Sequence, residues 1–191
     1  EFGYKIKLLA IAKEQGDVIE ARVEPTMIPL QHPMSTVNGV FNAVYVVGDN
    51  AVPRLYSGKG AGAAPTGSAV VSDIVDMAVR RGAACAKKGL AGGDTGKRIK
   101  KGEESVSPFY MRFKAQDQPG VLSRISGILS EYEISIAAVI QKGRKEKEYV
   151  PIVMLTYEAS VGNLMRAKEK IDQLPFIEGP SVHIRIEENN L

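Results

Sequence analysis

The second half of the chain has the most regular pattern of apolar and polar positions. In residues 109–115 and 182–186 apolar residues alternate with polar ones, as in strands that bury one face, and residues 134–140 and 150–157 are largely apolar. Two further segments carry apolar residues at the three- and four-residue spacing of amphipathic helices. The predicted elements are a strand at 109–115, a helix at 121–132, strands at 134–140 and 150–157, a helix at 161–174 and a strand at 182–186. This βαββαβ order predicts a ferredoxin-like domain.

The first half is less regular but also mixes strands with a helix. Segments 6–12 and 18–23 flank a Gly-containing turn, which predicts a β-hairpin. A rigid loop is expected next, because proline fixes φ and cannot donate to a ladder, and this stretch holds Pro25, Pro29 and Pro33. The remaining predicted elements are a strand at 41–47, a short returning strand at 54–56 and a helix from 67 to about 81.

Residues 89–106 separate the two halves. Four glycines in residues 89–96 and then a Lys/Arg cluster at 97–101 leave too little apolar surface to offset the entropy cost of ordering. We interpret this stretch as an exposed linker rather than a nucleic-acid patch. The sequence therefore predicts a first region at 1–88, the linker, and a second region at 107–191.

Composition narrows the class of protein. The chain is 44% hydrophobic and 25% charged, which is ordinary for a globular protein. No apolar run approaches the roughly 20 residues that span a bilayer, so we expect no membrane partner. A net charge of +3 gives no reason to expect nucleic-acid binding. The single cysteine, Cys85, is expected to be inert packing and fits a cytoplasmic location. The only two histidines, His32 and His183, lack neighbouring ligands at metal spacing, so no metal site is predicted.

The loop that contains Gly58, Gly60 and Gly62 is the first candidate site. Glycines without side chains allow a ligand to approach the backbone closely, and the helix that follows favours an anion or a polar ligand edge. The spacing fits neither a P-loop nor a Gly-x-Gly-x-x-Gly dinucleotide fingerprint. An equally weighted alternative to a ligand site is a purely structural loop that lets the following helix pack closely on a sheet.

Three segments resemble the homoserine dehydrogenase family. Residues 3–9 look like a strand of its catalytic region, and residues 37–44 are similar to the stretch before its last strand. Residues 58–73 resemble the Gly-x-Gly-Ala-Gly-x-x-x-Thr-x-x-Ala-Val-x-x-Asp signature that closes that region. The resemblance implies NAD(P)H-dependent interconversion of L-aspartate 4-semialdehyde and L-homoserine, in the pathway to threonine, methionine and isoleucine. NADP or NAD would be the cofactor.

The resemblance also implies a limited role for this chain. The cofactor-binding role of the loop carries over to Gly60, Ala61 and Gly62. The family's Rossmann domain, proton-donor lysine and substrate-binding acids have no counterpart here. Lys5 and Lys7 alternate on a predicted strand and are expected to be solvated. We therefore assign no catalytic residue and predict no dehydrogenase activity for the chain alone.

The turn before the helix at 121–132 is the second candidate site. Asp117 is expected to cap that helix, and Gly120 to permit a tight entry. In its βαββαβ context this loop resembles the ligand loop of ACT domains, which bind small amino acids against a partner domain. The resemblance implies an effector, L-threonine by pathway logic, and a homodimer or homotetramer. The implied effector residues are Asp117, Pro119, Gly120, Val121, Leu122 and, on the partner side, a strand that begins at Ile134.

The expected fold class is α+β: the C-terminal piece of a mixed-sheet substrate and dimerisation domain, followed by a ferredoxin-like ACT domain. Two other functions stay open. One is a non-enzymatic module that senses an amino acid and dimerises. The other is an unrelated ACT-containing enzyme such as an aspartate kinase, although such kinases typically carry paired ACT units.

Overall fold

The computed structural model describes residues 2–80, 96–141 and 148–188 of the chain. The chain forms two compact units, one built from residues 1–28 with 98–190 and the other from residues 29–97. The predictions for Cys85, for residues 89–95 of the linker and for the charged tip at 142–147 fall outside the described residues.

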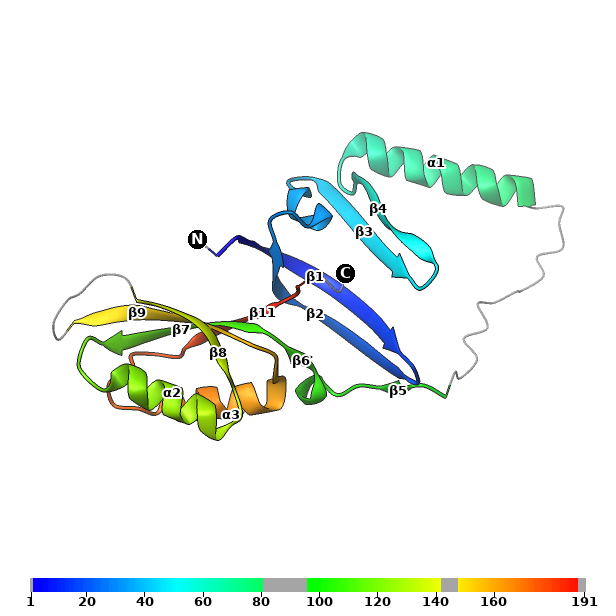
Figure 1. Ribbon diagram of the computed structural model, residues 1–191. Coiled ribbons are helices and arrows are strands. Elements are labelled where there is room, and N and C mark those ends of the chain that lie inside the picture. The colour runs from blue at the N-terminus through cyan, green and yellow to red at the C-terminus, as the bar shows by residue number, and fades with distance from the viewer. Residues whose placement is uncertain (1, 81–95, 142–147, 189–191) are drawn as a thin grey trace. The chain divides into compact units, whose positions relative to one another are not determined.

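The first unit is built on one sheet (Figure 1). Among the described residues, strands join it in the order β1-β2-β11-β7-β9-β8, and β5 pairs with β2. The bounds are β1 (Tyr4–Gln15), β2 (Val18–Pro29), β5 (Arg98–Ile99), β7 (Phe109–Gln116), β8 (Ile136–Gln141), β9 (Tyr149–Thr156) and β11 (Val182–Ile186). A small antiparallel pair joins β6 (Val106–Ser107) to β10 (Ala159–Ser160).

The predicted ferredoxin-like order is confirmed. The chain runs β7, α2 (Val121–Glu131), β8, β9, α3 (Val161–Asp172), β11. Strand β7 pairs antiparallel with both β11 and β9, and β8 pairs antiparallel with β9. Each of these strands and helices lies within two residues of its predicted bounds.

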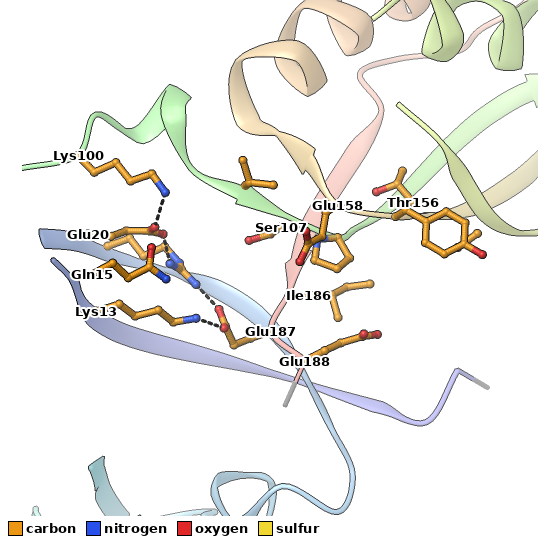
Figure 2. A pocket seen from close by; sticks show the side chains of 15 residues that line it. Lys13, Gln15, Glu20, Lys100, Ser107, Thr156, Glu158, Ile186, Glu187 and Glu188 are labelled. Carbon is orange, nitrogen blue, oxygen red and sulfur yellow. Dashed lines mark hydrogen bonds and ion pairs between the residues drawn. The ribbon is translucent and has the colours of Figure 1, made fainter. Parts of the chain in front are cut away.

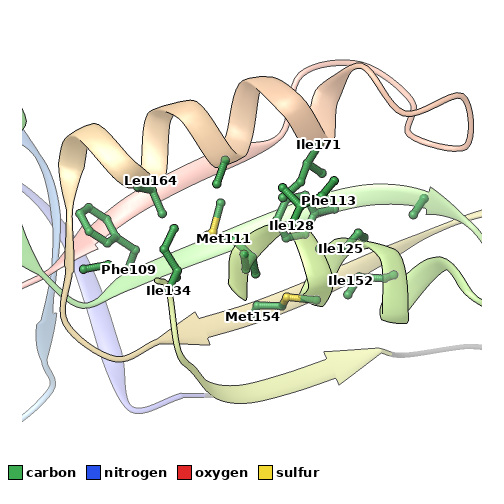
Figure 3. Packing of buried hydrophobic residues seen from close by; sticks show 14 of the residues in the cluster. Phe109, Met111, Phe113, Ile125, Ile128, Ile134, Ile152, Met154, Leu164 and Ile171 are labelled. Carbon is green, nitrogen blue, oxygen red and sulfur yellow. The ribbon is translucent and has the colours of Figure 1, made fainter. Parts of the chain in front are cut away.

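Alternation along β7 explains the core (Figure 3). Phe109, Met111, Phe113 and Ala115 are buried while Arg112 and Lys114 are exposed, because successive side chains point to opposite faces. The buried face meets α2 and α3, whose inward side chains complete one apolar cluster. Fully burying each large apolar side chain stabilises the fold by about 1.5–3 kcal/mol.

The position of β11 corrects one expectation. The alternation of residues 182–186 predicts that His183 points outward from the last strand. Strand β11 lies between β2 and β7, so both of its edges are paired. His183 is half-buried, and burial, reinforced by the charge of Lys168, lowers its pKa. Arg185, on the same face of the strand, is only 6% exposed.

Two stretches expected to lack ladder pairing contain strand. Strand β2 continues through Pro25 to Pro29, and a 3-10 turn (Pro33–Thr36) follows only then. Proline is tolerated where a strand needs no donor from that residue. In the predicted linker, β5 runs parallel to β2, a second 3-10 turn occupies Gly102–Glu104, and β6 follows. Its described part is therefore tied to the first unit.

The second unit contains β3 (Phe41–Gly48), β4 (Ala51–Lys59) and α1 (Ala63–Arg80). Strands β3 and β4 form an antiparallel hairpin, and β4 is longer than predicted. Helix α1 begins four residues before the predicted start. Pro65 lies in its first turn, where the missing amide costs no helical hydrogen bond. No residue of α1 is buried.

Candidate functional site

The glycine loop connects β4 to α1 within the second unit. Its residues, Gly60 to Gly62, are all exposed. The Gly60 amide donates to the carbonyl of Val40 (3.1 Å), and the Gly62 carbonyl accepts from the amide of Thr66 (3.1 Å) at the start of α1. Gly62 has φ +131°, a conformation that residues with side chains rarely adopt. The loop is thus anchored at both ends by backbone hydrogen bonds and presents bare backbone at the surface.

Gly60 is restricted by a neighbour on β3. A Cβ atom added to Gly60 would lie 2.0 Å from the Nδ2 atom of Asn42 and 3.1 Å from its Cγ. A Cβ added to Gly58, two residues earlier, would meet nothing within 4 Å. A Cβ at Gly60, unlike one at Gly58, would therefore displace the Asn42 side chain.

The predicted effector loop leads from β7 into α2. We expected the Asp117 side chain to cap α2. The N-cap residue is instead Gly120, three residues later, with φ +90°, and no side-chain hydrogen bond caps the helix. The Asp117 carboxylate accepts a hydrogen bond from Gln141 at the end of β8 (3.2 Å). This contact ties the loop to the last residue of β8 in the same chain.

The six predicted effector residues differ in exposure. Pro119, Gly120 and Leu122 are exposed, and Leu122 is 42% exposed. Val121 and Ile134 are each 3% exposed and belong to the core cluster of this unit. The exposed residues are the ones that this chain makes available to a ligand, while Val121 and Ile134 hold the loop and the start of β8 in place.

Sequence reasoning missed a charged cavity where β2 meets β11 (Figure 2). It has a volume of about 580 Å³ and lies within the first unit. The Glu187 carboxylate, which directly follows β11, pairs with Lys13 on β1 and with Arg22 on β2. Lys100 pairs with Glu20 across 3.2 Å. The missed signal was the alternation Glu20-Ala-Arg22-Val-Glu24, which places three charges on one face of a strand.

Burial and neighbouring charges or hydrogen bonds together shift the pKa values of Glu20, Arg185 and Tyr4. Burial raises the pKa of Glu20, but the hydrogen bond from Lys100 and the charge of Arg22 outweigh it, so the net shift is downward. Burial lowers the pKa of Arg185, opposed by the carboxylate of Glu24. Burial and a hydrogen bond to Glu188 raise the pKa of the Tyr4 hydroxyl to about 12.

Two searches of the described residues were negative. No helix in residues 2–80, 96–141 or 148–188 is long and apolar enough to cross a membrane. Within the same ranges, no three His, Cys, Asp or Glu side chains are grouped so that they could hold a metal ion.

Comparisons with known proteins give two family matches. The sequence model of the homoserine dehydrogenase family matches residues 1–75, and that of the ACT domain matches residues 109–176. Curated homoserine dehydrogenases from Neisseria gonorrhoeae and Helicobacter pylori are 40% and 37% identical, each over 98% of this chain. The alignments cover 44% of each of those proteins, so the chain spans less than half of their length.

A solved structure agrees with these matches. The homoserine dehydrogenase of Thiobacillus denitrificans is 39% identical and superposes with a TM-score of 0.84, over 97% of this chain and 43% of that one. The enzyme of S. aureus, at 24% identity and a TM-score of 0.58, shares the fold. Residues 1–75 of the chain therefore belong to the homoserine dehydrogenase family, and residues 109–176 form an ACT domain.

Proposed function

We propose that this chain is the part of a homoserine dehydrogenase that closes the cofactor site and senses an amino acid. The whole enzyme would interconvert L-aspartate 4-semialdehyde and L-homoserine in threonine, methionine and isoleucine biosynthesis, in the cytoplasm. The similarity over 98% of the chain to a curated homoserine dehydrogenase carries this proposal. Residues 1–88 would form the end of the catalytic region, residues 89–106 would be a linker, and residues 107–191 would be the regulatory ACT domain.

The cofactor would be NADP or NAD, whose reduced form supplies the hydride, and Gly60, Ala61 and Gly62 would form one wall of its site. The loop fits this role because exposed backbone without side chains allows a flat ring to approach within van der Waals distance. The φ of Gly62 and the backbone hydrogen bonds of Gly60 and Gly62 fix the shape of that wall before a ligand arrives. No residue of this chain is assigned to proton transfer.

The test of the catalytic role is a chimera in which this chain replaces the matching segment of the Neisseria gonorrhoeae enzyme. We expect NADPH-dependent reduction of L-aspartate 4-semialdehyde by the chimera and none by the 191-residue chain alone. Gly62→Ala strains the loop and is expected to raise the KM for NADPH on the order of tenfold. Gly58→Ala, which adds a Cβ into open space, is the matched control. Turnover by the chain alone would contradict the proposal.

L-Threonine is the proposed effector, bound by the loop from Asp117 to Leu122 and by the start of β8 on a partner subunit, beginning at Ile134. The assembly would be a homodimer or homotetramer. The exposure of Pro119, Gly120 and Leu122 supports this site, and the hydrogen bond between Asp117 and Gln141 holds the loop against β8 of its own subunit. Titration calorimetry should detect L-threonine binding to the chain. Leu122→Ala should weaken it roughly fivefold, as expected for lost apolar contact of about 1 kcal/mol.

Met165→Ala is the matched control, since Met165 on α3 is 44% exposed, close to the 42% of Leu122. It should leave L-threonine affinity unchanged. Absence of any binding heat with L-threonine would reject this effector while leaving the catalytic proposal untouched.

A further inference from the structure

The backbone connection between the homoserine dehydrogenase part of the first unit and its ACT fold is slight. Strands β2 and β11 share only two register pairs, Arg185 with Thr26 and Ile186 with Met27. One more hydrogen bond joins them, from the Glu187 amide to the carbonyl of Met27 (2.9 Å). A ladder this short leaves much of the connection to side chains.

The Glu187 side chain supplies the first part of that connection. Glu187 is 5% exposed, and its two carboxylate oxygens pair with Lys13 on β1 and Arg22 on β2. The same residue thus holds β2 through its amide and both hairpin strands through its side chain. Removing one partner of a buried pair leaves an uncompensated charge, which costs far more than losing an exposed pair.

Arg185 supplies the second part with the opposite charge. Its Nε atom lies 2.6 Å from the Glu24 carboxylate, and its Nη1 atom lies 3.8 Å from Glu20. Its Nη1 also donates to the Ser107 hydroxyl at 3.2 Å. Arg22 closes the network, since it pairs with Glu20, Glu24 and Glu187. Oppositely charged side chains of β2 and of the β11 segment therefore pair with one another.

The cavity beside this network does not call for a separate ligand. Its cations are already matched: Lys13 and Arg22 pair with Glu187, and Lys100 pairs with Glu20. The charged groups are better explained by their contacts with one another, which run between the hairpin and the strand that completes the ACT fold (Figure 2).

We propose that the ion-pair network of Glu187 and Arg185 with the β1–β2 hairpin couples the ACT domain to the catalytic region. The inference rests on the proposed function, because it assigns a route for the regulation proposed there. A change in the ACT domain that moves β11 would have to break or carry along several desolvated ion pairs. Such a network favours one arrangement over a continuous range of intermediates, which is what coupling between two regions needs.

The first experiment is hydrogen exchange on the 191-residue chain without ligand. Glu187→Gln should accelerate amide exchange in β1 and β2 on the order of tenfold and leave α2 and β9 unchanged. The matched control is Glu131→Gln, which removes one carboxylate of an exposed pair with Lys170. Lys13→Met removes a partially exposed arm of the network and should give the same pattern more weakly. Unchanged exchange in β2, or equal acceleration throughout, would overturn the proposal.

The second experiment adds L-threonine. In the natural chain, L-threonine should slow amide exchange in residues 116–122 and in β2. In Glu187→Gln it should slow exchange in residues 116–122 alone. Protection of residues 116–122 without β2 in the natural chain would refute the coupling and retain the effector. If L-threonine protects neither segment, the effector assignment fails, and the ligand-free experiment alone decides whether the network ties the two regions.

Discussion

Helices α1 and α2 carry apolar residues at the same spacing, yet only one of them is packed. Val121, Ile125, Ile128 and Leu129 of α2 are buried against the sheet. In α1, Val70 and Ile74 are 52% and 55% exposed, and none of its residues is buried. The ACT region contains its own sheet surface and therefore its own core. The region around α1 offers that helix no such surface among the described residues.

The difference shows that helical periodicity fixes which side of a helix is apolar, while burial depends on what faces that side. Most helical stability in proteins comes from packing of the apolar face rather than from propensity. The ACT region should therefore respond to core substitutions as a folded domain does, and α1 should tolerate them. Four substitutions test this comparison.

Ile125→Ala on α2 should have the largest effect. Ile125 is fully buried, so the substitution leaves a cavity and should lower the free energy of unfolding by about 2–5 kcal/mol. Ile74→Ala on α1 is the matched control and should change it by less than about 0.5 kcal/mol. Urea denaturation followed by circular dichroism measures both. Similar losses for the two variants would break the comparison.

Asp172→Asn should destabilise the ACT region by about 1–2 kcal/mol at neutral pH. The Asp172 carboxylate accepts from the amide of Ser181 (3.0 Å) and pairs with Lys168 (2.7 Å). Burial raises its pKa, but these hydrogen bonds outweigh burial and hold the pKa below the ordinary 3.8. A depressed pKa contributes stability that is present above the unfolded value and is lost as pH falls through the folded value.

The free energies of unfolding of the natural chain and of Asp172→Asn should therefore differ near pH 7. They should converge as the pH falls below the ordinary aspartate pKa of 3.8 and the folded carboxylate becomes protonated. Asp76→Asn breaks the exposed pair with Arg80 on α1, which has the same four-residue spacing. It should show almost no pH-dependent difference. A constant gap for Asp172→Asn down to pH 2 would contradict the assigned role.

Ser160→Ala should cost about 1 kcal/mol, because Ser160 is the N-cap of α3. Its hydroxyl accepts from the amide of Asn163 at 3.1 Å, and alanine leaves that donor without this partner. Ser72→Ala, inside exposed α1, should be neutral or slightly stabilising, since alanine is the better helix former. Thermal unfolding distinguishes the two, and an unchanged midpoint for Ser160→Ala would exclude the capping role.

Gly60→Ala should have the smallest effect, about 0.5–1 kcal/mol, because the exposed Asn42 side chain can rotate away from the added Cβ. The side-chain amide signals of Asn42 in NMR spectra should move, and those signals should stay in place in Gly58→Ala. Combining Gly60→Ala with Asn42→Ala should remove most of the cost. A penalty that persists in the double variant would show that Asn42 is not its cause.

The elements of the ACT region could be predicted because each depends on neighbours in sequence. Alternation in residues 109–115 and helical spacing in residues 121–132 give the observed β7 and α2 almost to the residue. The glycine loop was found from its composition and family signature. The proximity of Asn42 to Gly60 was not, because only the pairing of β3 with β4 brings the two residues together.

The sequence by itself determined the strands and helices of the ACT region, their apolar faces and both family resemblances, since periodicity and motifs depend on local order. The tertiary structure decided that β11 lies inside a sheet rather than at its edge, and therefore that Arg185 and Glu187 are buried among charges from β1 and β2. Parallel pairing of segments about 160 residues apart leaves no local signature, because the strands meet only after the chain has folded.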